Sequence, residues 1–80
     1  LTRKQRHMNY QEIKQALSEA EETRNKIAMF HYITLRYASN FIDEDPKIFC
    51  QTVGMQESYA AEFLKMRALY LLMKENNLSL

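Results

Sequence analysis

The sequence has very little of the material that turns and strands require. Its 80 residues include one glycine, one proline and no tryptophan, while 46% are hydrophobic. Such a composition is typical of helical proteins, because helices need few residues that take unusual backbone conformations. The one β-rich patch, residues 31–37, has no turn residue on either side. We therefore expect an all-α fold.

Cysteine is also scarce, since Cys50 stands alone and an internal disulfide is excluded. No C-x-x-C pair or histidine cluster offers a metal site, so we expect no cofactor. The longest apolar run, residues 68–73, is far shorter than the roughly 20 residues that span a bilayer. Without a membrane segment or signal peptide, the expected location is the reducing cytoplasm.

A strong excess of positive charge is absent as well. Eleven basic and ten acidic residues give a net charge of +1, and three of the basic ones lie in residues 1–8. His7-Met8 is a dipeptide that a common cloning site leaves, so we expect residues 1–8 to be flexible or tag-derived; a basic arm is the alternative. Residues 9–80 are then a single helical domain with eight basic and ten acidic residues. Residues 46–80 hold four basic and three acidic residues, so any nucleic-acid face belongs to this half.

The first half of the chain has a clear helical period. Apolar residues recur at three- and four-residue steps from Tyr10, and polar residues occupy the other side. The pattern predicts either one long helix over residues 9–40 or two helices meeting near residues 22–25. Residues 28–35 are apolar on more than one face, and this width suggests a second packing partner such as another copy of the chain.

Residues 46–65 carry the most specific signal. Asp45 is a good N-cap, and Pro46 sits in a first helical turn, where its missing N–H costs no hydrogen bond. Gly54 then ends a helix of about eight residues, because glycine takes a left-handed conformation without steric cost. A last helix is expected from about Gln56 to Glu75, so the segment predicts two helices joined by a short turn.

This outline resembles the helix-turn-helix superfamily of DNA-binding domains, with no particular family indicated. Helix-turn-helix proteins carry a small residue inside the first helix, matched here by Cys50, and a turn glycine, matched by Gly54. They also need apolar residues where the two helices touch. Those positions are Phe49, Val53, Met55, Ala60 and Phe63.

The resemblance implies that the start of the second helix lies in the major groove of DNA. Its outward side chains would contact bases, because amide, carboxylate, hydroxyl and methyl groups suit the edges exposed there. The expected base contacts are Gln56, Glu57, Ser58, Ala61, Glu62 and Lys65. The expected phosphate contacts are Lys47, Gln51, Thr52, Tyr59 and Arg67. Two carboxylates facing a polyanion, Glu57 and Glu62, reduce affinity unless each has a base partner or a basic neighbour, so a purely solvated helix face is the alternative.

The last helix is apolar all round between residues 69 and 73. A chain of this size has too little material to cover every side of that segment, so a second subunit is its expected cover. The expected dimer interface comprises Leu69, Tyr70, Leu72, Met73, Met29 and Ile33.

Three classes of function fit these patterns. The first is a small dimeric DNA-binding protein, such as a transcriptional regulator or a plasmid- or phage-type accessory factor, whose partners are double-stranded DNA and itself. The second is a protein-interaction module without DNA contact, and the third is a structural oligomer. Catalysis is not expected. Cys50 and His31 are residue types that serve as nucleophile and base, but Cys50 occupies the small buried position of the motif, where an inert core thiol is anticipated.

Overall fold

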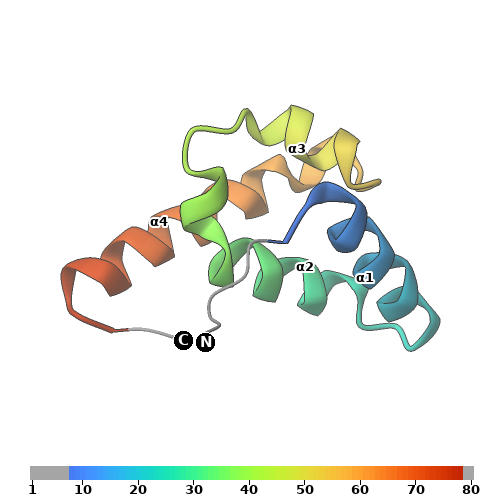
Figure 1. Ribbon diagram of the computed structural model, residues 1–80, viewed down its shortest axis with the longest axis horizontal. Coiled ribbons are helices and arrows are strands. Elements are labelled where there is room, and N and C mark those ends of the chain that lie inside the picture. The colour runs from blue at the N-terminus through green and yellow to red at the C-terminus, as the bar shows by residue number, and fades with distance from the viewer. Residues whose placement is uncertain (1–7, 79–80) are drawn as a thin grey trace.

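The computed structural model describes residues 8–78 as a set of packed helices (Figure 1). In chain order these are α1 (Tyr10–Glu22), α2 (Lys26–Arg36), a 3₁₀ turn η1 (Ala38–Phe41), α3 (Pro46–Thr52), a second 3₁₀ turn η2 (Glu57–Tyr59) and α4 (Ala60–Glu75). The all-α prediction is confirmed. No helix within residues 8–78 is long and apolar enough to cross a membrane. Expectations for residues 1–7 lie outside the described part.

The region 9–40 forms two helices and a 3₁₀ turn, so the single long helix is wrong and the alternative of two helices is confirmed. Asn9 starts α1 with a reciprocal capping box: its side chain accepts the Glu12 N–H at 2.8 Å, and its own N–H donates to the Glu12 carboxylate at 3.0 Å. The helix then buries Ile13, Leu17 and Ala20 along one face.

Arg24 makes the break between α1 and α2. It adopts a left-handed conformation with φ of 62°, and the Asn25 N–H donates to the Ala20 carbonyl at 2.8 Å. This is a Schellman ending, in which the residue after the C-cap is most often glycine. Because an arginine occupies the position, the sequence carried no conventional stop signal there.

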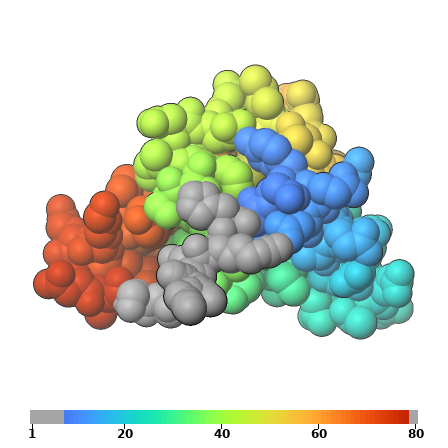
Figure 2. Space-filling model, viewed as in Figure 1, coloured from blue at the N-terminus to red at the C-terminus, as the bar shows by residue number. Residues whose placement is uncertain are grey.

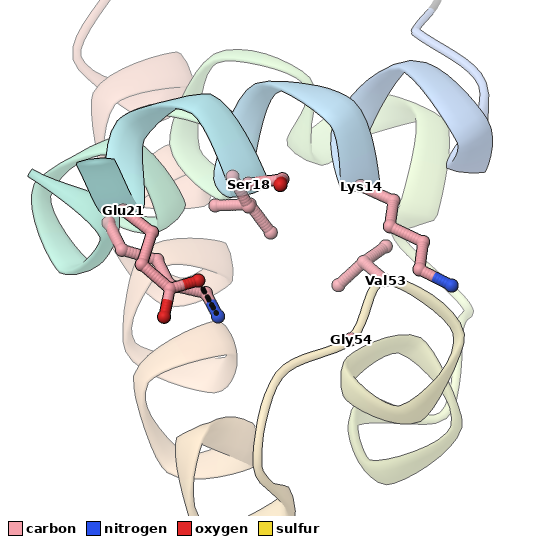
Figure 3. Close-up of a pocket in the computed structure, with 7 residues that line it drawn as sticks. Lys14, Ser18, Glu21, Val53 and Gly54 are labelled. Atoms are coloured by element: carbon pink, nitrogen blue, oxygen red, sulfur yellow. Dashed lines mark hydrogen bonds and ion pairs between the residues drawn. The ribbon is translucent and has the colours of Figure 1, made fainter.

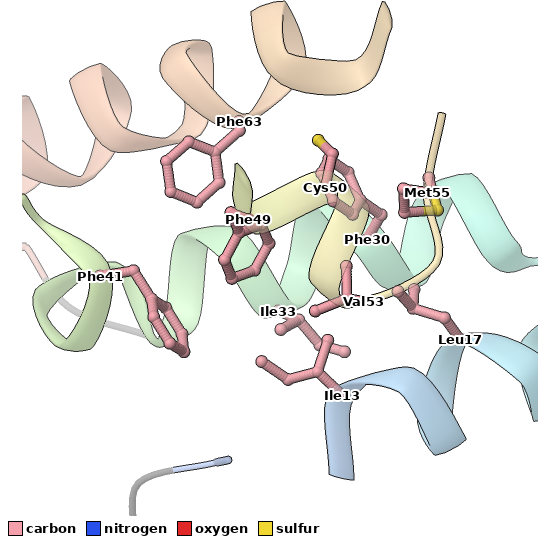
Figure 4. Close-up of a cluster of buried hydrophobic side chains, with 10 residues drawn as sticks. All are labelled: Ile13, Leu17, Phe30, Ile33, Phe41, Phe49, Cys50, Val53, Met55 and Phe63. Carbon is pink, nitrogen blue, oxygen red and sulfur yellow. The ribbon is translucent and has the colours of Figure 1, made fainter. Parts of the chain in front are cut away.

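Residues of all four α-helices form the core. Helix α2 packs against both α1 and α4, and α3 packs against α4. Phe49 of α3 sits at the centre, fully buried, with its ring centroid 4.6 Å from that of Phe63 and 5.0 Å from that of Phe41 (Figure 4). Phe30 and Ile33 of α2 face the same cluster. These contacts fix the orientation of α4 relative to α3.

Candidate nucleic-acid interface

The turn between α3 and α4 has the local geometry that the sequence predicts. The Asp45 side chain caps α3 by accepting the N–H groups of Lys47 at 2.9 Å and Ile48 at 3.2 Å. At the other end Gly54 has φ of 82°, and the Met55 N–H donates to the Cys50 carbonyl at 2.8 Å. The chain therefore reverses within a few residues of Gly54.

The apolar positions of the helix-turn-helix outline also pack as expected. Phe49, Cys50, Val53, Met55 and Phe63 are buried. Ala60 is half-buried against the same cluster. A cysteine that is fully buried leaves room for close approach of the neighbouring helix, which explains the need for a small residue there.

The predicted base-reading residues lie at the start of the second helix of this pair. That start is a 3₁₀ turn, η2, so Gln56 is its N-cap and the α-helix itself begins at Ala60. Gln56, Glu57 and Ser58 are exposed on or beside η2, as are Ala61 and Lys65 on α4. Glu62 differs from them, because its side chain is half-buried.

Both carboxylates in this set have partners. The Gln51 side-chain amide donates to Glu57 Oε2 at 2.8 Å and so joins the end of α3 to η2. Glu62 lies 2.9 Å from His31 Nε2 through Oε1 and accepts from Lys65 Nζ at 3.1 Å through Oε2. The hydrogen bonds from His31 and then Lys65 hold the pKa of Glu62 below its ordinary value. The Lys65 ammonium offsets the negative charge of Glu62, whereas the neutral Gln51 amide leaves the charge of Glu57 in place.

The residues predicted to contact phosphate fall into two groups. Lys47 is exposed in the first turn of α3, and Gln51 and Thr52 are exposed at the other end of α3, beside the turn. Tyr59 is half-buried, with its ring 6.0 Å from that of Phe30. Arg67 is held inside the domain.

Arg67 ties α4 to the segment before α3. Its Nη2 donates to the Glu44 carbonyl at 2.8 Å, and its guanidinium carbon lies 5.0 Å from the centre of the Phe63 ring. A guanidinium stacked on a core ring and bonded to backbone orients the helix that carries it. Arg67 therefore supports the fold, and its expected contact with phosphate stays a prediction.

The residues predicted to form a dimer interface do not share one environment. Leu69 and Leu72 of α4 are 38% and 56% exposed, and Tyr70 and Met73 are half-buried. Met29 packs partly against the core. Ile33 is only 1% exposed and belongs to the core of a single chain, so its expected place in the interface is wrong. Helix α2 packs against α1 and α4, which bury Phe30 and Ile33, whereas Ile27 stays 39% exposed.

Exposed leucines extend along α4 beyond the residues that were predicted. Leu64 and Leu71 are each 48% exposed. Phe63 is the one buried residue of α4, all of which lies within residues 8–78. Figures 1 and 2 show the C-terminal end of α4, in red, projecting past the other helices. A large part of the apolar surface of α4 therefore has no cover within residues 8–78.

The family model described as an HTH-like domain matches residues 6–76. The chain belongs to the HTH-like domain family. The match includes all four α-helices, whereas the sequence resemblance rested on residues 46–65. No curated protein and no solved structure matches the chain. An HTH-like domain indicates DNA binding in general.

Cys50 in this HTH-like domain is fully buried beneath the turn. Burial, and secondarily the negative charge of Glu57, raises the pKa of the Cys50 thiol. A thiol with a raised pKa stays protonated at neutral pH, and the thiolate is the nucleophilic form. The buried thiol therefore serves as a small apolar side chain in the HTH-like domain.

An open hollow of about 180 Å³ lies beside the turn of the HTH-like domain (Figure 3). Lys14, Leu17, Ser18 and Glu21 of α1 line one side of it, and Lys26, Val53 and Gly54 complete it. Lys26 pairs with Glu21 at 3.4 Å. Ligand pockets usually measure about 300 to 1,000 Å³. A hollow this small and open is a poor candidate for a cofactor site, although it leaves Lys14 next to the turn.

Tyr10 is expected to lose its proton only at a higher pH than an ordinary tyrosine. Burial, the 2.7 Å hydrogen bond that its hydroxyl donates to Glu44 and the charge of Glu44 raise the pKa of Tyr10 to about 12. Because the pKa in the fold exceeds the ordinary value of 10, the resulting stabilisation is complete below pH 10 and is lost as the pH rises towards 12. An absorbance titration of tyrosinate should show a step near pH 12 that Tyr10→Phe removes and Tyr32→Phe retains. Identical titrations of Tyr10→Phe and the wild type would contradict this.

Proposed function

We propose that this HTH-like domain is a small dimeric DNA-binding protein of the reducing cytoplasm, of the type of a transcriptional regulator or a plasmid- or phage-type accessory factor. It reads the major groove with the helix that begins near Gln56. The observation that carries the proposal is the helix-turn-helix geometry around Gly54 combined with an exposed polar start of the second helix. Such a start is the part of a helix-turn-helix that reaches base edges.

The side chains at this start suit base recognition. The Gln56 amide can bond adenine bidentately, the Ser58 hydroxyl can donate or accept, and the Ala61 methyl group can contact a thymine methyl group. All three are exposed. The Gln51 amide holds the Glu57 carboxylate in a fixed orientation beside the turn and leaves its negative charge unchanged.

In this proposal the exposed residues of α3 bind phosphate. Lys47 follows the N-cap of α3, and Thr52 lies in its last turn. The Asp45 carboxylate already occupies the N–H groups at the start of α3, so the Lys47 ammonium itself is the group that would meet a phosphate. Gln51 is engaged with Glu57 and contributes to phosphate binding only through its remaining N–H.

The test is a fluorescence-anisotropy titration of a labelled random-sequence duplex at about 50 mM and about 200 mM salt. Binding should weaken steeply with salt, since contacts to phosphate release counterions. Lys47→Ala should weaken binding to all sequences and lower the salt slope by about one. Lys74→Ala, which removes the same charge from the last turn of α4, is the matched control and should change little. Replacing Arg3, Lys4 and Arg6 by Gln separates any contribution of the N-terminal segment.

Sequence-specific contacts need a second readout. Once a preferred duplex is selected, Gln56→Ala and Ser58→Ala should each weaken binding to it by about 1 to 3 kcal/mol without lowering helicity. Equal loss on the preferred and on random duplexes would remove the base-reading roles. No binding by the wild type at about 50 mM salt would refute DNA binding.

The exposed leucines of α4 support a second candidate, a protein-interaction module without DNA contact. Leu64, Leu71 and Leu72 are each close to half exposed or more, which is unusual for neighbouring residues of one helix. Under this alternative the anisotropy experiment is negative at both salt concentrations. The dimer proposed above accounts for Leu71 and Leu72 with a second copy of the chain instead.

A further inference from the structure

His31 makes a contact that the sequence did not suggest. It lies on α2, 31 positions before Glu62, yet its Nε2 is 2.9 Å from the Glu62 carboxylate. Both side chains are about one-third exposed, so the pair sits at the rim of the α2–α4 contact. Lys65, one turn further along α4, binds the other oxygen of the same carboxylate at 3.1 Å. The three residues form a connected row, His31–Glu62–Lys65.

The row has a fixed end and an exposed end. The backbone of His31 is held within α2, where the Thr34 hydroxyl contacts its carbonyl oxygen at 3.2 Å and the neighbouring Phe30 is fully buried. The Lys65 side chain is 67% exposed. A glutamate on an open helix surface samples several rotamers, and ordering it costs conformational entropy. The bond from His31 restricts Glu62 before any ligand arrives, so less of this entropy is lost on binding.

The chemistry of the row matches one kind of base pair. In the major groove a C·G pair presents the cytosine N4 amino group as a donor and guanine O6 and N7 as acceptors. A carboxylate accepts from cytosine N4, and a lysine ammonium donates to guanine O6 and N7. Glu62, at the rim of the α2–α4 contact, and the exposed Lys65, one turn along α4, supply this acceptor and donor side by side. Each carboxylate oxygen keeps a free lone pair after the contacts to His31 and Lys65.

The charge balance of the row favours its approach to DNA. Glu62 alone would bring a negative charge towards phosphates. His31 donates to it through Nε2–H, because a carboxylate only accepts, and Lys65 contributes a positive charge. Glu62 is therefore both oriented and shielded by residues of two helices.

We infer that His31 is a specificity-determining positioning residue, which holds Glu62 so that Glu62 and Lys65 together read a C·G base pair. The inference rests on the proposed function and adds to it the base pair and the residue that sets its recognition. His31 acts through Glu62 and touches no base itself. Its loss should therefore relax the preference at one position of the target while leaving the other positions unchanged.

The experiment is a selection of bound duplexes from a randomised pool, sequenced for the full-length wild type and for variants. The wild type should prefer C·G over other pairs at one position. His31→Leu, which keeps an apolar body but removes the donor, should lower that preference about tenfold, within the range that a good base contact provides. His31→Gln, whose amide can donate to Glu62, should retain most of it. Glu62→Gln should lose the same preference as His31→Leu.

A matched control separates this role from general support of the α2–α4 contact. Lys26→Ala also removes an ion pair of α2, the one with Glu21 at 3.4 Å, but leaves Glu62 untouched. It should keep the preference at every position. Circular dichroism checks that each variant is helical, and Glu62→Gln carries the test if His31→Leu does not fold.

The outcomes are distinct. Wild-type binding with an unchanged base preference in both His31→Leu and Glu62→Gln overturns the inference and leaves the proposed function standing. A uniform loss of affinity across all sequences in His31→Leu makes His31 a structural residue and also overturns it. Absence of DNA binding by the wild type refutes the proposed function and the inference together.

Discussion

Replacing Phe49 by alanine is expected to lower the free energy of unfolding by about 3 to 5 kcal/mol. The side chain is fully buried, and its ring contacts those of Phe41 and Phe63 with centroid distances of 5.0 and 4.6 Å. Tyr10 and Phe30 approach it from α1 and α2, at 6.1 and 6.3 Å. Truncation would leave a cavity where the helices converge, and an 80-residue domain has few other contacts with which to close it.

The measurement is urea unfolding followed by far-ultraviolet circular dichroism. Domains of this kind have only about 5 to 15 kcal/mol of total stability, so Phe49→Ala should shift the midpoint strongly or prevent folding. Tyr32→Ala provides the matched control, since it truncates an aromatic ring that is 49% exposed on α2. Its effect should stay within about 0.5 kcal/mol. A loss below about 1 kcal/mol in Phe49→Ala would show that Phe49 does not organise the core.

The helix-turn-helix segment was predictable because its signals are local. An N-cap, a proline in the first turn and a glycine after the helix act on neighbouring backbone groups and do not depend on the rest of the fold. Asp45, Pro46 and Gly54 all have the roles expected of them. The small residue Cys50 is likewise buried. Residues whose neighbours in sequence decide their conformation are the ones that sequence reasoning places correctly.

The break after α1, by contrast, has no local signal in the sequence. Arg24 carries the left-handed conformation that a glycine would usually signal, at an intrinsic cost of about 1 to 2 kcal/mol. The arrangement persists because α2 must fold back to bury Phe30 and Ile33 against the core. A tertiary contact, not the residue type at the turn, therefore selects the boundary. The sequence could show two alternatives there but could not choose between them.

The remaining differences between the predicted and the observed candidate site involve pairs of residues that lie far apart in the sequence. Glu62 appeared on the outward side of its helix, but its bond to His31 depends on how α2 crosses α4. Arg67 appeared to be a surface cation, but the Glu44 carbonyl, 23 positions earlier, accepts its hydrogen bond. Helical periodicity defines the faces of each helix and leaves open which face meets which neighbour. The partners of charged residues are consequently the least predictable feature of the site.

Leu72→Glu is expected to convert the proposed dimer into a monomer. Leu72 is 56% exposed on the end of α4 that projects from the body of the domain (Figure 2). Burying a leucine at an interface contributes about 1.5 to 3 kcal/mol, and a carboxylate placed there must also be desolvated. The dimer dissociation constant should therefore rise by about 100-fold or more, since each 1.4 kcal/mol corresponds to tenfold.

Sedimentation equilibrium at several concentrations provides the measurement. The wild type should approach twice the chain mass of 9.6 kDa, and Leu72→Glu should stay near that mass while remaining helical. Ile48→Glu is the matched control, because Ile48 is 54% exposed but lies in the first turn of α3. It should leave the dimer intact. An unchanged dimer mass in Leu72→Glu would exclude this end of α4 from the interface. A monomeric wild type would remove the dimer from the proposal, and the exposed leucines of α4 would then favour a different protein as their partner.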